Sequence, residues 1–124
     1  MKIKTSELKG IALDYAVALA EGGENFRFDT VSTYWITING KDRALKASWA
    51  QSFIPSTNWA QAGEIIEREE IAIMCHHSGA FWDARVNTLP PVYWRGETSL
   101  IAAMRCYVAS KLGDEVEIPE ELVG

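Results

Sequence analysis

The residues with the clearest capacity for chemistry lie in one short segment, from Ser56 to Gly63. Asn58 and Gln61 supply hydrogen-bond donors and acceptors, and Trp59 supplies a flat apolar surface. Gly63 would let another backbone come close. This set could bind a partner or a ligand, but a tryptophan in a compact loop also commonly folds back onto the core as a plug. Both interpretations of Trp59 stay open from the sequence alone.

Acidic residues follow this segment at positions 64, 67, 69 and 70, with Arg68 among them. A general acid needs burial or a like-charged neighbour to raise its pKa, and Arg68 would oppose that rise. A solvated face is therefore the simpler interpretation, and we assign no catalytic residue. The candidate binding residues are Ser56, Thr57, Asn58, Trp59, Gln61, Glu67 and Arg68.

A second group of reactive side chains consists of Cys75, His76 and His77. On a strand, adjacent side chains point to opposite faces, so the two histidines could not bind one metal without a bend. Cys75 and His77 would share a face and form half a zinc site, but no further ligands follow at a usable spacing. Cys75 and His76 diverge in the same way, which argues against a cysteine nucleophile. We expect no metal and no cofactor.

Composition narrows the class of protein. The 124 residues carry a formal net charge of −5 without a cluster of lysine and arginine, so direct binding to nucleic acid is not expected. Residues 11–20 are apolar, but Asp14 interrupts them and the stretch is too short to span a bilayer. Cys75 and Cys106 each lie in an apolar run, which predicts buried free thiols and a reducing cytoplasm. The sequence contains no Gly-rich phosphate loop, nucleophile elbow or H-E-x-x-H motif.

The element expected to organise the fold is a helix over residues 100–112. Thr98 can cap its start, and Gly113 can adopt the left-handed conformation that ends it. The side opposite its apolar arc carries small side chains, and Arg105 and Lys111 are the only charged residues that need contact with water. The helix should therefore be covered on most sides. Its broad apolar arc consists of Leu100, Ile101, Met104, Tyr107, Val108 and Leu112. We predict that this is the central core helix.

The first half of the chain predicts one helix and a hairpin. The helix should begin at a Thr5 or Ser6 cap and end at the pair Gly22-Gly23. Asn39-Gly40 predicts a hairpin turn, because both residues tolerate a positive φ. Strands are expected near residues 26–28, 34–38 and 43–47.

The second half predicts a loop, a second hairpin and a tail. After Pro55, one short helical turn should carry Trp59 and stop at Gly63. The second hairpin should use residues 71–76 and 81–86, followed by a loop over residues 87–97. In the tail, Val116 and Ile118 alternate with acids, which leaves two alternatives: a short edge strand, or a solvated and mobile segment. We predict a single α+β domain over residues 1–113, with two main helices packed on a small antiparallel sheet, and an acidic C-terminal tail over residues 114–124.

Three stretches together are similar to a known family: MKIKTSEL at residues 1–8, PSTNWAQ with IIERE at residues 55–69, and LIAAMRC with KLGDEV at residues 100–116. They resemble the NinX-like proteins of temperate bacteriophages and prophages, a family of unknown function. In that family the loop tends to read Ser-Thr-Asp-Trp-Ala-Gln-Gly-Gly-Pro, whereas this chain has Asn58, Ala62 and Glu64. Asparagine caps a helix as aspartate does, so a capping role remains possible at Asn58. Loss of the carboxylate argues against an acid–base or metal-binding role there. The resemblance implies a phage or prophage accessory protein in the bacterial cytoplasm, and it brings no catalytic residues.

Three hypotheses about function follow. The first is a non-enzymatic accessory protein that binds a host or phage protein through the surface near Trp59 and Gln61. The second is a small-molecule or nucleotide-processing enzyme with a pocket at the same loop, using Glu67 or Glu69. The third is an acidic decoy of nucleic acid, suggested by the net charge and the tail. We favour the first, because the distinctive loop comes without a catalytic set.

Overall fold

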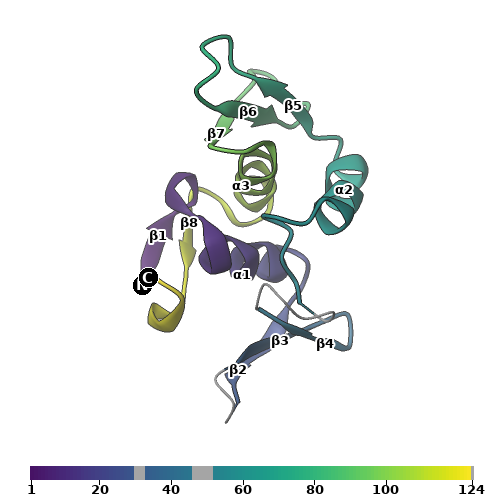
Figure 1. Cartoon of the computed structure of the whole chain (residues 1–124), viewed down its shortest axis with the longest axis vertical. Coiled ribbons are helices and arrows are strands. Elements are labelled where there is room, and N and C mark those ends of the chain that lie inside the picture. Colours follow the sequence, from purple (N-terminus) through teal and green to yellow (C-terminus); the bar gives the residue numbers. More distant parts are fainter. Residues whose placement is uncertain (30–32, 46–51, 124) are drawn as a thin grey trace.

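Three helices form the middle of the molecule in the computed structural model, which describes residues 1–29, 33–45 and 52–123. They are α1 (Gly10–Ala20), α2 (Trp59–Arg68) and α3 (Ser99–Leu112), accompanied by short 3-10 turns at Thr5–Glu7 and Glu120–Leu122. α3 packs against α1, α2 and the strands that follow α2, so it lies at the centre of the fold (Figure 1).

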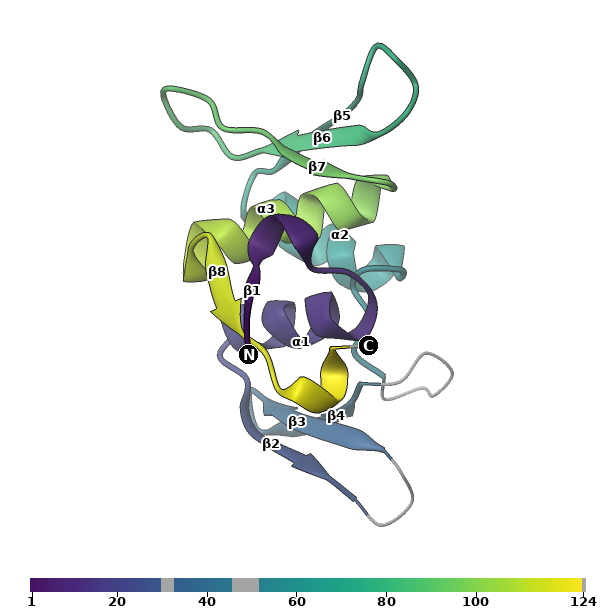
Figure 2. The ribbon, with the colours of Figure 1, turned by 90° about the vertical axis from the view of Figure 1, so that its left-hand side faces the viewer.

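The eight strands within the described residues form three separate antiparallel sheets. These are β1 (Lys2–Lys4) with β8 (Glu115–Glu117); β2 (Glu24–Phe28), β3 (Tyr34–Ile38) and β4 (Lys41–Ala44); and β5 (Ala72–Cys75), β6 (Trp82–Arg85) and β7 (Trp94–Gly96). The two three-stranded sheets lie at opposite ends of the molecule with the helices between them (Figure 2). The α+β class is confirmed, but the expected arrangement of two helices on one sheet is only roughly matched. Each hairpin pairs locally, and the helical layer keeps the two hairpins apart.

α3 is the core helix that the sequence predicts. The Thr98 hydroxyl accepts from the Ile101 amide at 3.1 Å, and Gly113 ends the helix with φ of +92°. Met104 and Tyr107 are both buried. The expectation that Arg105 needs water is wrong in detail, because its guanidinium donates to two backbone carbonyls, those of residues 8 and 95, at 2.8 Å each.

α1 begins later than predicted. Thr5 does not cap it: the Thr5 hydroxyl donates to the Gly113 carbonyl at 2.7 Å, and the Thr5 amide donates to the Asp114 carbonyl at 2.8 Å. The hydroxyl and amide of Thr5 therefore bind the segment that follows α3 and do not cap α1. α1 starts at Gly10 without a side-chain cap. Gly23 marks the predicted end, since its amide donates to the Ala18 carbonyl at 2.7 Å.

The first hairpin is confirmed. Asn39 and Gly40 have φ of +51° and +78°, and the register pairs Ile38 with Lys41 across them. The returning strand therefore starts at Lys41, directly after the two-residue turn, and ends at Ala44 rather than spanning residues 43–47. Residues 46 and 47 lie outside the described part of the chain.

α2 is longer than the single turn that was predicted. It runs through Gly63 to Arg68. Asn58 caps its start, and Ala62 and Ile65 form the buried side of the helix, which packs against α3. That packing outweighs the helix cost of one interior glycine, about 1 kcal/mol.

The second hairpin, β5 with β6, is also confirmed. The segment after it is not only a loop, because β7 adds a third strand in which Trp94 pairs with Ala84. Gly96 allows this strand to lie on α3, since a Cβ there would come within 2.4 Å of the Ala102 nitrogen. Trp94 in this strand is half-buried, whereas Tyr93 before it is exposed.

The residues after Gly113 return to the start of the chain. β8 pairs with β1, as the edge-strand alternative requires, and the Met1 amino group donates to the Ile118 carbonyl at 3.0 Å. Val116, Ile118 and Leu122 are buried.

Candidate functional site

The segment that precedes α2 is a tight turn in which two amides donate to the same backbone carbonyl. The amides of Thr57 and Asn58 both donate to the Ile54 carbonyl, at 3.0 and 2.9 Å, around Pro55. The Asn58 side chain then accepts from the Gln61 amide at 3.0 Å and caps α2. The capping role expected to remain at Asn58 is confirmed, and asparagine performs it as well as aspartate would.

Gln61 holds this turn from the inside. Its side-chain oxygen accepts from the Ile54 amide at 2.7 Å, and its side-chain nitrogen donates to the Ser52 carbonyl at 2.8 Å. The oxygen and the nitrogen of the Gln61 side-chain amide thus both have hydrogen-bond partners within the chain. We interpret it as a residue that positions the loop rather than one that meets a partner directly.

Trp59 is not a core plug. Trp59 is the first residue of α2 and is 60% exposed, whereas Phe53, Pro55 and Ser56 before it are buried. The indole is therefore presented to solvent from a rigid helix start rather than folded back.

The helix surface beside Trp59 is open and partly acidic. Ala60, Glu64 and Glu67 are exposed, and a Cβ at Gly63 would meet nothing within 4 Å. Of the seven predicted site residues, Thr57, Trp59 and Glu67 lie exposed at this surface, whereas Ser56, Asn58 and Gln61 face inward. We call the surface formed by Thr57, Trp59, Ala60, Gly63, Glu64 and Glu67 the Trp59 face.

A buried carboxylate lies directly under the loop. Asp14 on α1 is 5% exposed, and its Oδ1 accepts from the Ser56 amide at 2.8 Å. Burial raises the pKa of Asp14 to about 6, even though hydrogen bonds from the Ser56 backbone and side chain lower it. In the sequence, Asp14 stands out only as a break in the apolar run of residues 11–20. A single acid on an otherwise apolar helix is the signal that could have identified it.

Asp14 lines a cavity of about 320 Å³ between α1 and the loop. The other lining residues are Gly10, Ile11, Leu45, Ile54, Ser56 and Thr57. Asp14 is the only charged residue in this set, and Thr57 connects the cavity to the Trp59 face.

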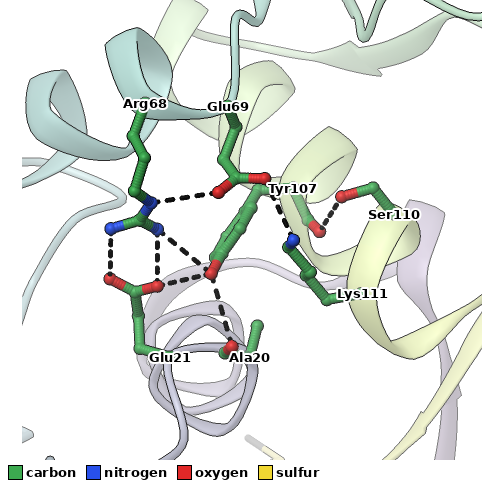
Figure 3. A network of polar contacts seen from close by, with 7 residues as sticks. All are labelled: Ala20, Glu21, Arg68, Glu69, Tyr107, Ser110 and Lys111. Atoms are coloured by element: carbon green, nitrogen blue, oxygen red, sulfur yellow. Dashed lines mark hydrogen bonds and ion pairs between the residues drawn. The ribbon is translucent and has the colours of Figure 1, made fainter. Parts of the chain in front are cut away.

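Arg68, the seventh predicted site residue, belongs to a polar network that joins the three helices (Figure 3). Its Nη2 lies 2.6 Å from Glu21 Oε2 and 3.2 Å from the Tyr107 hydroxyl, and its Nε lies 3.0 Å from Glu69 Oε2. Lys111 pairs with Glu69 at 3.1 Å, and the Tyr107 hydroxyl also donates to Glu21. Burial, and then the hydrogen bond to Glu21, raise the pKa of Tyr107. Arg68 therefore already has partners on α1 and α3.

A second cavity, of about 240 Å³, lies beside Gln61 and bears on the enzyme hypothesis. Glu64 lines it together with Glu21, Lys41 and Arg43, but neither Glu67 nor Glu69 is among its lining residues. The acids suggested for catalysis are thus not gathered in a pocket at this loop.

The histidine and cysteine expectations need correction. His76 and His77 lie beyond the end of β5, and their ring centroids are 4.1 Å apart rather than on opposite faces. Cys106 is buried, which raises its pKa to about 11, but Cys75 is exposed because it lies at the strand's open end. In the part of the chain described, no three His, Cys, Asp or Glu side chains are placed to share a metal ion. Nor does any described helix combine the length and apolar character needed to cross a membrane.

Comparison with known proteins agrees with the resemblance carried by the loop and the last helix. The family described as "Bacteriophage P22, NinX" matches residues 4–111, which include α1, the loop, α2 and most of α3. No curated protein matches the chain. Because the family match covers most of the sequence, the chain belongs to the NinX family of bacteriophage proteins, and this membership supports a role as a phage accessory protein.

Proposed function

We propose that this phage accessory protein is a non-enzymatic interaction module and that the Trp59 face is its contact surface. The observation that carries the proposal is the indole of Trp59, 60% exposed beside an unobstructed glycine. Large aromatic side chains commonly supply most of the binding energy at protein interfaces. An exposed tryptophan on an ordered helix start is well placed to do so.

The surroundings of Trp59 suggest how it would bind. The turn is closed by Asn58 and Gln61, so the backbone that carries the indole is ordered before a partner arrives and less entropy is lost on binding. Ala60 and Gly63 leave room for a partner's backbone, and Glu64 and Glu67 add negative charge at the edge. The complementary surface would have an apolar pocket with basic residues around it, on a host or phage protein.

Affinity capture from infected bacteria tests the proposal. The wild-type chain, Trp59→Ala and Phe28→Ala are immobilised, and each retained protein is purified for titration calorimetry. Phe28 is a matched control, because it is a 57% exposed aromatic residue on strand β2, away from α2. We expect Trp59→Ala to weaken binding about tenfold or more, and Phe28→Ala to leave it unchanged. Equal binding by the wild type and Trp59→Ala would rule out the Trp59 face as the contact surface.

A further inference from the structure

Among the described residues that line its cavity, Asp14 is the only charged one. Its Oδ1 is bound by the Ser56 amide. A buried carboxylate without an opposite charge is costly, because hydrogen bonds alone replace only part of its hydration. A cation entering the cavity would remove that cost.

We infer that this cavity receives a lysine side chain from the protein that covers the Trp59 face. The inference rests on the proposed function, since it names the chemistry of that partner. Ile11, Leu45 and Ile54 line the cavity and would surround the methylene stem of the lysine. The ammonium group would then donate to the Asp14 carboxylate.

Lysine fits the carboxylate better than arginine does. A guanidinium binds a carboxylate best with two parallel hydrogen bonds, one to each oxygen. Oδ1 of Asp14 already accepts from the Ser56 amide at 2.8 Å. An ammonium group is a compact point charge that needs a single lone pair of the carboxylate, so it can bind beside the Ser56 donors without disturbing the hydrogen bond that holds the loop.

The position of the cavity links it to the Trp59 face. Ser56 and Thr57 line the cavity, and Trp59 follows Thr57 by two residues, a span of at most about 7 Å. One partner segment could therefore place a lysine in the cavity while its apolar surface covers the indole. The net charge of −5 would favour the approach of such a basic segment.

The cavity can be tested without the partner, by NMR titration with n-butylammonium. We expect saturable shifts of the Ile11, Ser56 and Thr57 amides, and binding about tenfold weaker in Asp14→Asn. Asparagine keeps an oxygen that can accept from the Ser56 amide, and its spectrum will show whether the fold is intact. n-Butanol has the same stem without charge, and tetramethylammonium has the charge without a donor. Both should leave the wild-type amides unshifted.

Several outcomes would overturn the inference. They are an equal response to n-butanol, equal binding of n-butylammonium by Asp14→Asn, or no saturable shift at all.

Binding to the captured partner separates this inference from the proposed function. Asp14→Asn should also weaken that binding about tenfold. If only Trp59→Ala weakens it, the lysine inference is wrong and the Trp59 face stands. If only Asp14→Asn weakens it, the Trp59 face is wrong.

Discussion

Asp14 should make the free protein less stable at neutral pH than in mild acid. Its pKa is raised from 3.8 to about 6, so between these values the folded chain holds a proton that the unfolded chain has lost. The contribution of this group is therefore greatest below about pH 4 and is lost as the pH rises through about 6. A pKa difference of this size corresponds to at most about 3 kcal/mol.

The substitution Asp14→Asn isolates that effect. At about pH 7.5 it should raise the free energy of unfolding by about 1–3 kcal/mol, and near pH 4 it should change it little. Urea denaturation at both pH values measures the difference. Glu67→Gln is the control, because Glu67 is exposed and its removal should have the same small effect at both. A less stable Asp14→Asn at neutral pH would contradict the burial argument.

Gln61 should contribute to stability through its two hydrogen bonds. In Gln61→Ala the Ile54 amide loses the acceptor that it has at 2.7 Å, and the loop loses its link to the Ser52 carbonyl. An amide left unpaired costs about 1–3 kcal/mol, so we expect a loss in that range by chemical denaturation. Glu64→Ala, on the exposed side of the same helix, should cost less than about 0.5 kcal/mol. Equal effects would show that Gln61 does not hold the turn.

At the scale of the element, α2 contains a glycine that its packing does not require. A Cβ at Gly63 would meet no atom within 4 Å, and the residue is inside the helix. Gly63→Ala should therefore stabilise the protein by about 0.5–1 kcal/mol in thermal or urea unfolding. Gly96→Ala is the opposite control, since its Cβ would come within 2.4 Å of the Ala102 nitrogen, and it should destabilise. A loss of stability in Gly63→Ala would mean that α2 is packed differently.

The elements predicted correctly are those whose signals are local. Thr98 and Gly113 bound α3 within its own sequence, and Asn39-Gly40 forms a turn from its own backbone preferences. The errors arise where a distant contact overrides the local signal. Thr5 looks like a cap but bonds to the chain beyond α3, with 108 residues between the hydroxyl and its acceptor.

The same contrast applies to the candidate site. The cap at Asn58 is three residues from the amide that it accepts from, so the sequence predicts it. Asp14 and Ser56 are 42 residues apart, and the contact between them could not be anticipated from either segment. Whether Trp59 is buried is a property of packing rather than of pattern: in the fold, the neighbouring Phe53 and Pro55 are buried and the indole is exposed.

At the scale of the whole molecule, α3 is the element against which most of the others pack. α1 and α2 contact it, and the β5–β7 sheet lies on it through Gly96 and Ala84. The network of Glu21, Arg68 and Tyr107 ties the ends of α1 and α2 to the middle of α3 (Figure 3). The Trp59 face is thus carried on a helix fixed at both ends, by its cap at the start and by this network at the end.

The C-terminal residues should be part of this same cooperative unit. Val116, Ile118 and Leu122 are 5%, 0% and 3% exposed, and β8 pairs with β1. Burial of each such side chain contributes about 1.5–3 kcal/mol, so deleting residues 115–124 should remove much of a total stability of about 5–15 kcal/mol. We expect a strongly lowered Tm and loss of the near-ultraviolet circular dichroism of the aromatic core. Deleting only residues 123 and 124 is the control and should change the Tm little, since Val123 is exposed. An unchanged Tm in the longer deletion would instead favour the independent acidic tail that the sequence predicts, with residues 1–113 folding alone.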